Sequence, residues 1–406
     1  MRTFRALRQC LTVVILCSSV AACTNDAEFQ DEDYIAGVDQ SSVKYQAGGN
    51  CWVYAAAGWA ESLHLRATNE EVDLSETYMT YWEMYERIVD SGKWKIGDIF
   101  RKDPTGLKMD ANGVIQIGGN WDDAITIMRK RGMMLDADFT PQDGEDNKNT
   151  TVPAAKDIIS ASLTSGVLKD KKSRRNHQLV RAELDRAFGL KPEVITRLDA
   201  VFGNDGETTL KKVDAATAAA AKVITPQAFQ VAVPDPLVGG QERKVRLAEV
   251  LTGELEWKLV TFSKKSSEAE QRAFFRRIQT ALHDHAPVVL GWGVDRAARD
   301  VDAYKLERLT TANANKNPDG HLVLVDDYQA TLKEGRVLKA GVLETRPEVL
   351  DAALRDDTRI DFLRVKNSWG PLYSTTGYFD LYANYLVGPT PAGVVPMRYI
   401  VLPAGY

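Results

Sequence analysis

The sequence predicts an α+β fold with a helical N-terminal lobe and a β-rich C-terminal lobe. In several early segments apolar residues recur at every third or fourth position, which is the spacing of an amphipathic helix. From Leu259 onward, short apolar runs typical of strands replace that pattern. With 406 residues, of which 44% are hydrophobic and 26% charged, the chain has a globular composition and is long enough for two packed lobes.

Three helices are expected in the first part of the chain. The first covers residues 51–65, and the second follows Ser75, a residue type that often caps a helix N-terminus. The third runs from Trp121 to Arg131 and ends at Gly132, since glycine commonly stops a helix. Residues 92–118 are punctuated by glycine and lysine and predict a loop.

The middle of the chain is expected to be helical and its end to contain strands. Residues 178–223 predict helices, and the polar stretch before them contains a basic run from Lys169 to Arg175. That run could bind anionic lipid or glycan, but a solvated helical surface is the favoured interpretation. A further helix over residues 267–284 precedes strands at 287–292, 322–325, 362–365 and 399–402.

The first 22 residues predict an export signal, with Arg2, Arg5 and Arg8 before an apolar stretch too short to span a membrane. The small residues that end in Cys23 resemble the bacterial lipobox, which implies cleavage before Cys23 and diacylglycerol on its sulfur. A plain signal peptide cut nearby is the alternative. We therefore expect an exported protein, lipid-anchored to the bacterial cell envelope at the outer membrane, facing the periplasm or the surface.

The number of cysteines singles out Cys51. Cys10 and Cys17 would leave with the signal and Cys23 would carry the lipid, so the mature protein would retain one thiol. Exported proteins usually pair their cysteines, and an unpaired one needs a function or burial. Cys51 begins a predicted helix, where backbone amides favour a thiolate, and Gly48 and Gly49 precede it. A buried structural cysteine is the alternative.

Among the five histidines, His321 is the best candidate for a catalytic base. His64 lies thirteen residues along the same helix as Cys51, about 20 Å away by helical rise. His177 follows the basic run and is expected to be exposed. His283 and His285 flank a helix end, where a positive charge would suit the helix C-terminus, and as a pair they would be a weak metal site. His321 follows a glycine and opens a predicted strand.

Asn367 could orient that imidazole. Its side-chain oxygen can accept a hydrogen bond from a ring N–H and fix the tautomer, and Trp369 could shield this bond from water. By themselves, Asn367, Ser368 and Gly370 could also form an ordinary turn.

Together these residues resemble the papain superfamily of cysteine peptidases. The segment from Gln46 to Trp52, then His321, then Asn367-Ser-Trp-Gly occur in the order typical of that superfamily. Segments 74–87, 118–122 and 225–229 are similar to its bleomycin hydrolase branch. The resemblance implies a catalytic triad of Cys51, His321 and Asn367, with Gln46 as an oxyanion donor. It also implies a substrate cleft lined by Gly118, Gly119 and Trp369, and a papain-like two-lobe fold with an antiparallel, β-barrel-like C-terminal lobe.

The chain departs from the papain pattern in several places. His321 follows Cys51 by 270 residues, against about 130 to 150 expected, so an insertion must lie between them. Gln46 is one residue closer to the nucleophile than in papain, and Leu322 stands where a small residue is common. The expected segments are a signal peptide (1–22), a lipidated tether (23–40), a helical lobe with the nucleophile (41–140), a mainly helical insertion (141–260) and a β-rich lobe with the His and Asn (261–406).

The predicted function is a cysteine-type peptidase that acts through a thiolate–imidazolium pair and a thioester. Aminopeptidase-like action and endopeptidase action are both left open. This chemistry requires no metal and no organic cofactor. A peptide or protein substrate is expected, and the net charge of −5 does not favour nucleic acid as a partner. The alternatives are a catalytically silent papain-fold lipoprotein that binds a partner, a cell-wall peptide amidase and a purely structural lipoprotein. The oligomeric state is not predicted.

Overall fold

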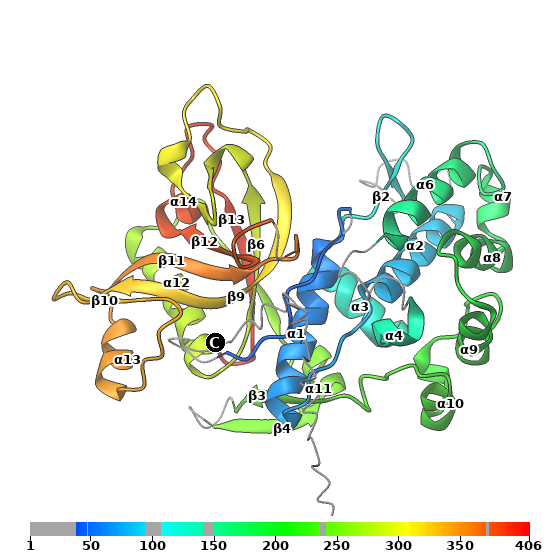
Figure 1. Ribbon diagram of the computed structural model, residues 1–406, viewed down its shortest axis with the longest axis horizontal. Helices are drawn as coiled ribbons and strands as arrows, with labels where there is room; N and C mark the ends of the chain where they lie inside the picture. The colour runs from blue at the N-terminus through cyan, green and yellow to red at the C-terminus, as the bar shows by residue number, and fades with distance from the viewer. Residues whose placement is uncertain (1–37, 47, 94–106, 141–149, 236–240, 371–372) are drawn as a thin grey trace, which may run out of the picture. The chain divides into compact units, whose positions relative to one another are not determined.

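A computed structural model describes residues 38–46, 48–93, 107–140, 150–235, 241–370 and 373–406 (Figure 1). These residues belong to one compact unit. The predicted export signal, the lipidation site Cys23 and most of the predicted tether lie outside them. No helix among the described residues is long and apolar enough to cross a membrane.

The predicted α+β class is confirmed, because helices occupy most of the first part and a large sheet most of the last (Figure 1). The α-helices are α1 (Cys51–Thr68), α2 (Glu76–Lys93), α3 (Trp121–Arg131), α4 (Asp136–Phe139), α6 (Thr151–Thr164), α7 (Lys171–Arg174), α8 (His177–Ala187), α9 (Pro192–Phe202), α10 (Ala215–Ala220), α11 (Leu247–Leu251), α12 (Glu268–His283), α13 (Pro347–Ala353) and α14 (Ala383–Val387). Short 3₁₀ turns are η2 (Leu210–Lys212), η3 (Arg296–Ala298) and η4 (Leu306–Arg308).

Local capping explains where the helices begin and end. The Ser75 hydroxyl accepts a hydrogen bond from the Tyr78 amide, which confirms it as the cap of α2. Asn120 and Asp123 form a capping box at the start of α3, and Gly132 ends that helix with a φ of 70°. Ser267 and Glu270 form an equivalent box on α12.

The last part of the chain forms a nine-stranded sheet in the order β5-β13-β6-β9-β11-β12-β8-β7, with β10 paired to β9. Its strands are β5 (Lys258–Thr261), β6 (Val288–Val294), β7 (Arg299–Asp300), β8 (Ala303–Tyr304), β9 (Asp319–Thr331), β10 (Val337–Leu338), β11 (Arg359–Lys366), β12 (Tyr378–Tyr382) and β13 (Met397–Leu402). All pairs are antiparallel except β12 with β8. A separate hairpin pairs β3 (Gln230–Pro234) with β4 (Glu242–Arg246).

The prediction of a loop over residues 92–118 is wrong for some of the residues that the structure describes there. Two-residue strands β1 (Lys108–Met109) and β2 (Ile115–Gln116) pair there. The Asp110 carboxylate accepts hydrogen bonds from the amides of Asn112 and Val114, so a side-chain-stabilised turn joins the strands.

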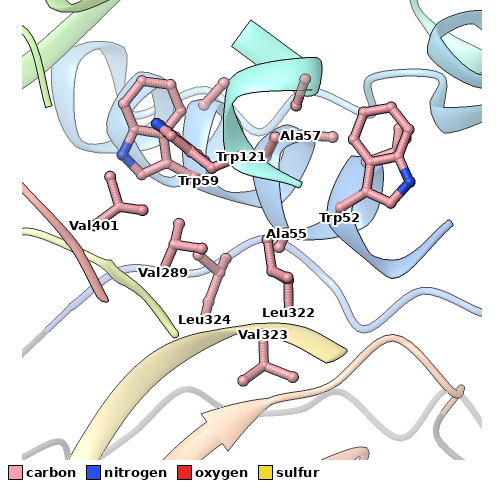
Figure 2. Close-up of a cluster of buried hydrophobic side chains, with 14 of the residues drawn as sticks. Trp52, Ala55, Ala57, Trp59, Trp121, Val289, Leu322, Val323, Leu324 and Val401 are labelled. Atoms are coloured by element: carbon pink, nitrogen blue, oxygen red, sulfur yellow. The ribbon is translucent and has the colours of Figure 1, made fainter. Parts of the chain in front are cut away.

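Helix α1 packs into the core of the molecule, and every residue from Cys51 to Leu63 is buried. Trp59 makes edge-to-face contacts with Trp121 of α3 and with Trp257, at 5.0 and 5.2 Å between ring centroids. Figure 2 shows Trp59 and Trp121, together with Leu322 and Leu324 of β9, gathered on α1. Because α1 is fixed against β9, its N-terminal residue Cys51 is held beside the first residues of that strand.

Candidate active site

Cys51 is the first residue of α1, and only 6% of it is exposed. The preceding Asn50 donates its side-chain amide to the Thr80 hydroxyl (3.1 Å) and does not cap the helix. The first amides of α1 therefore remain without a side-chain cap next to the thiol. Burial raises the pKa of the Cys51 thiol, and hydrogen bonds from the backbone of Leu322 and Trp52 offset only part of this rise.

His321 lies on β9 and is hydrogen-bonded to Asn367. Its Nε2 is 2.7 Å from the Asn367 Oδ1, so Nε2 carries the proton and Nδ1 is left as the basic nitrogen. The imidazole stacks on Trp369 at 4.7 Å and makes an edge contact with Trp292. Burial lowers the pKa of His321 to about 4, although the bond to Asn367 opposes this shift.

These two pKa shifts oppose the thiolate–imidazolium pair expected from the sequence. Burial disfavours the charged form of both groups, so it favours a neutral Cys51 thiol and a neutral His321 imidazole in the resting structure. Sequence reasoning considered the helix dipole at Cys51 but not the depth at which both side chains are buried.

Gln46 is tied to the strand end that carries Asn367. Its backbone amide donates to the Ser368 carbonyl (2.5 Å), and its Oε1 accepts from the Ser368 hydroxyl (2.6 Å). Its Nε2 donates to the Gly48 carbonyl at 2.8 Å. Since a side-chain amide has two N–H groups, one of them remains for a ligand in the cleft.

One cleft of about 620 Å³ brings most of the predicted site residues together. It is lined by Gln46, Gly48, Gly49, Cys51, Arg87, Gln116, Gly118, Gly119, Asn120, Asp123, Val294, Arg296, Asp319, Gly320, His321 and Trp369. Asn367 does not line the cleft, because it lies behind the imidazole that it contacts.

The two predicted substrate-binding glycines have different surroundings. A Cβ on Gly118 would meet nothing within 4 Å, so this residue borders open cleft. A Cβ on Gly119 would lie 2.6 Å from the Trp52 ring, whose Nε1 donates to the Ile117 carbonyl. Glycine is thus needed at position 119 for packing against α1, whereas Gly118 leaves room for a ligand.

A buried charged cluster behind the cleft was not predicted from the sequence. Lys44 contacts the carboxylates of Glu61 (2.6 Å), Asp73 (2.7 Å) and Glu76 (2.9 Å). Lys366 donates to the backbone carbonyl and the hydroxyl of Ser41. Lys44 is two residues from Gln46 and Lys366 is adjacent to Asn367, so the cluster fixes the segments that carry two site residues. A glutamate on the buried face of the predicted helix 51–65 was the available signal.

The ionisation of this cluster is asymmetric. Burial alone would lower the pKa of Lys44, but the three carboxylates raise it well above its usual value. Burial would raise the pKa of Glu61, but Lys44 and Lys366 lower it. For Glu76, burial and the neighbouring Glu61 outweigh Lys44, so its pKa is raised. Of the two buried carboxyls, Glu76 therefore takes up a proton more readily than Glu61.

The remaining histidines lie away from the cleft. His64 contacts the Gln230 carbonyl (2.7 Å). The expectation that His177 is exposed is wrong, because it is half-buried beside Tyr85 and Glu207. His283 does not act as a charged helix cap, because burial lowers its pKa to about 4. No group of three potential metal ligands is found in the described parts of the chain.

The basic run predicted as a helical surface forms the short helix α7, in which no residue is buried. Arg174 donates to the carbonyls of Leu168 and Lys169. The structure thus agrees with the favoured interpretation of that run.

Comparison with known proteins gives only distant likenesses. No family model matches the chain, and no curated protein matches it. PepW from Lactobacillus rhamnosis shares 13% identity over 90% of this chain and 80% of its own, with a TM-score of 0.41. Xylellain, a cysteine protease from Xylella fastidiosa, shares 13% identity over 93% and 92% of the two chains (TM-score 0.35). A ragweed pollen cysteine protease in its proform shares 16% identity over 94% and 69% (TM-score 0.31).

Proposed function

We propose that the chain is a papain-like cysteine peptidase that hydrolyses peptide bonds through Cys51, His321 and Asn367. The observation that supports this best is the 2.7 Å contact between His321 Nε2 and Asn367 Oδ1, with Cys51 and His321 lining the same cleft. A thiol, a base with its tautomer fixed and a group that orients the base are the requirements of thiol acyl transfer.

The reaction proceeds by acyl transfer. As the Cys51 sulfur bonds to the substrate carbonyl carbon, its proton passes to Nδ1 of His321, and the carbonyl oxygen becomes an oxyanion. The Cys51 amide and Gln46 Nε2 donate to that oxygen. The imidazolium then protonates the leaving amine while the C–N bond breaks, which leaves a thioester. Water, deprotonated by His321, hydrolyses the thioester and restores the thiol.

We further propose that the chain belongs to the bleomycin hydrolase branch and has an aminopeptidase-like action. Both proposals rest on the motifs at 74–87, 118–122 and 225–229. Tyr406 lies against α12, where its carbonyl accepts from Arg277 and its hydroxyl donates to Asp284. Tyr406 is not among the residues that line the cleft. Export and lipidation at Cys23 are likewise proposed from the sequence.

The test is covalent labelling combined with three variants. An epoxide inhibitor of thiol peptidases should modify Cys51 in the folded protein at neutral pH, as located by mass spectrometry of peptides. Cys51→Ser and His321→Gln should abolish peptide hydrolysis, whereas His64→Gln should retain it, since His64 lies on the same helix as Cys51 but outside the cleft.

Three results would contradict the proposal or redirect it. Folded protein without an adduct on Cys51 would contradict peptidase action. A biological activity that Cys51→Ser leaves intact would favour the catalytically silent binding protein. Hydrolysis of peptidoglycan stem peptides without action on ordinary peptides would favour the cell-wall amidase.

A further inference from the structure

We propose that Asp319 makes the cleft select a cationic group on the substrate residue second to the scissile bond on its N-terminal side, here called the subsite-2 residue. The chemistry required is a Lys or Arg side chain, or the N-terminal ammonium of a short peptide. This inference rests on the proposed peptidase function and adds a substrate class to it.

The strand geometry places Asp319 next to the reaction centre. Asp319 and His321 are two residues apart on β9, so their side chains share one face and their Cα atoms are roughly 7 Å apart. The register agrees, because Trp292 of β6 pairs with His321 and Val294 pairs with Asp319. The edge contact between Trp292 and the imidazole shows that paired residues lie on the same face. Two extended substrate residues span about 7 Å, so the second residue on the N-terminal side of the scissile bond reaches the level of Asp319.

Asp319 lies on the same side of the cleft as Gly118 and Gly119, where the resemblance to the papain superfamily implies that the acyl part of the substrate binds. In the sheet, β9 has β11 on one side and β6 followed by β13 on the other. Trp369 follows β11, while the ladder partner of Asp319 is Val294 of β6. The loop with Gly118 and Gly119 leads into α3, whose first residues Trp121 and Asp122 lie near Tyr399 of β13. Asp319 therefore faces the wall formed by Gly118 and Gly119.

Two positive and two negative side chains line the cleft: Arg87, Arg296, Asp123 and Asp319. Arg87 pairs with the buried Glu83 one turn earlier on α2 and donates to the Gly118 carbonyl, so its charge is compensated within its own wall. Asp123 is likewise held in its own wall by the Asn120 amide. Arg296 and Asp319 are therefore the two charges that remain for a substrate, and a substrate cation would pair with Asp319.

Asp319 is also available to a ligand. It is exposed, it lines the cleft, and no ion pair or side-chain hydrogen bond to it occurs among the described residues. By contrast, the Asp123 carboxylate accepts a hydrogen bond from the Asn120 amide and caps α3. A strand residue also has a defined position, whereas Arg296 extends from an exposed 3₁₀ turn. These differences favour Asp319 as the residue that sets the preference.

The experiment measures kcat/KM of the full chain on N-acetylated peptides that differ only in the subsite-2 residue: Lys, Gln, Glu or Leu. The wild type should prefer Lys over Glu by roughly two- to fivefold, which is the scale of an exposed ion pair. Asp319→Asn should remove the preference. Asp356→Asn, which changes an exposed aspartate outside the cleft, should retain it. Raising the ionic strength from about 50 to about 500 mM should weaken the preference, because salt screens exposed charges.

A second set of peptides, with a free N-terminus on the subsite-2 residue, distinguishes the two sources of the cation. A preference seen only in this set and lost in Asp319→Asn assigns the site to the terminal ammonium. Equal subsite-2 selectivity in wild type and Asp319→Asn would overturn the inference while leaving peptidase action intact. Absence of both turnover and epoxide labelling of Cys51 would instead overturn the proposed function on which the inference rests.

Discussion

The helical part of the chain and the region behind the cleft both bury positive charge, but they compensate it differently. In the helical part, Arg131 is 2% exposed, lies 4.1 Å from the Trp82 ring centroid and donates to the carbonyls of Gly206 and Thr208. Its carboxylate partner is Glu86, at 2.7 Å. Aromatic rings and backbone carbonyls thus compensate much of the Arg131 charge, so that fewer carboxylates are needed around it.

Behind the cleft the charges are compensated mainly by other charges. Three carboxylates (Glu61, Asp73 and Glu76) lie around Lys44, and Lys366 adds a second cation that lowers the pKa of Glu61. The cluster therefore has one more acid than base, and its ionisation can change with pH. The arginine site thus joins helices away from the cleft, whereas the lysine cluster lies beside the segments that carry Gln46 and Asn367.

The largest expected effect comes from removing the lysine at the centre of the cluster. Lys44→Met leaves the buried Glu61 and Glu76 without their main cation, which should lower the free energy of unfolding by about 3 to 5 kcal/mol. Urea denaturation measures this loss, with Lys305→Met as the control, because Lys305 pairs with Asp300 near the surface. In the protein that remains folded, kcat/KM should also fall. A loss under about 1 kcal/mol would show that the cluster tolerates the missing charge.

The next effect distinguishes the arginine site from the lysine cluster. Arg131→Met removes the cation over Trp82 and leaves the carbonyls of Gly206 and Thr208 without a donor. The free energy of unfolding should therefore fall by about 3 kcal/mol. The kcat/KM of the folded protein should not change, because none of these residues lines the cleft. Arg129→Met, an exposed arginine on the same helix, is the control. A fall in kcat/KM for Arg131→Met alone would remove the contrast between the regions.

A buried histidine, His321, and a half-buried one, His283, extend the comparison to acid pH. His321 in the cleft and His283 at the end of α12 both have a pKa of about 4, below the usual 6.5. Because the unfolded chain binds their protons more readily, stability should decrease as the pH falls from about 6.5 to about 4. Each histidine contributes about 3 kcal/mol over that range.

His283→Gln isolates one of these contributions. It removes a titrating group while glutamine can still contact the Tyr328 hydroxyl, which lies 2.8 Å from the histidine Nε2. The variant should lose less stability between pH 6.5 and 4 than the wild type, as measured by urea denaturation at a series of pH values. Identical pH dependence in the two proteins would show that His283 titrates normally. The pH profile of kcat/KM should be unchanged, with its acidic limb near the pKa of His321.

The sequence predicted the elements whose signals are local. Residues 51–65 and 121–131 have a helical repeat with recognisable ends, and both form helices. The strand at 322–325 has a short apolar run, and it lies within β9. Cys51, His321 and Trp369 were grouped by the order of their motifs, and the structure places all three on one cleft.

The features that sequence reasoning missed depend on distant contacts or on burial. Lys366 donates a hydrogen bond to Ser41, which lies more than 300 positions earlier in the chain. Nothing in either sequence segment identifies the other as its partner. The strands β1 and β2 have two residues each, too few for a periodic pattern. The neutral state of His283 follows from the depth of its side chain, whereas its place at a helix end predicted a positive charge.

The smallest expected effect comes from removing a helix cap. It can be compared between a cap in the cleft wall and a cap of the same kind outside the cleft. Asn120 caps α3 and lines the cleft, whereas Ser267 caps α12 and does not line it. Replacing either residue with alanine removes one capping hydrogen bond and should cost about 1 kcal/mol in denaturant unfolding. The effect on catalysis should differ, because the Asn120 cap fixes the loop that contains Gly118 and Gly119. Asn120→Ala should therefore lower kcat/KM while Ser267→Ala does not. Equal activity at equal loss of stability would mean that the geometry of this wall does not depend on its cap.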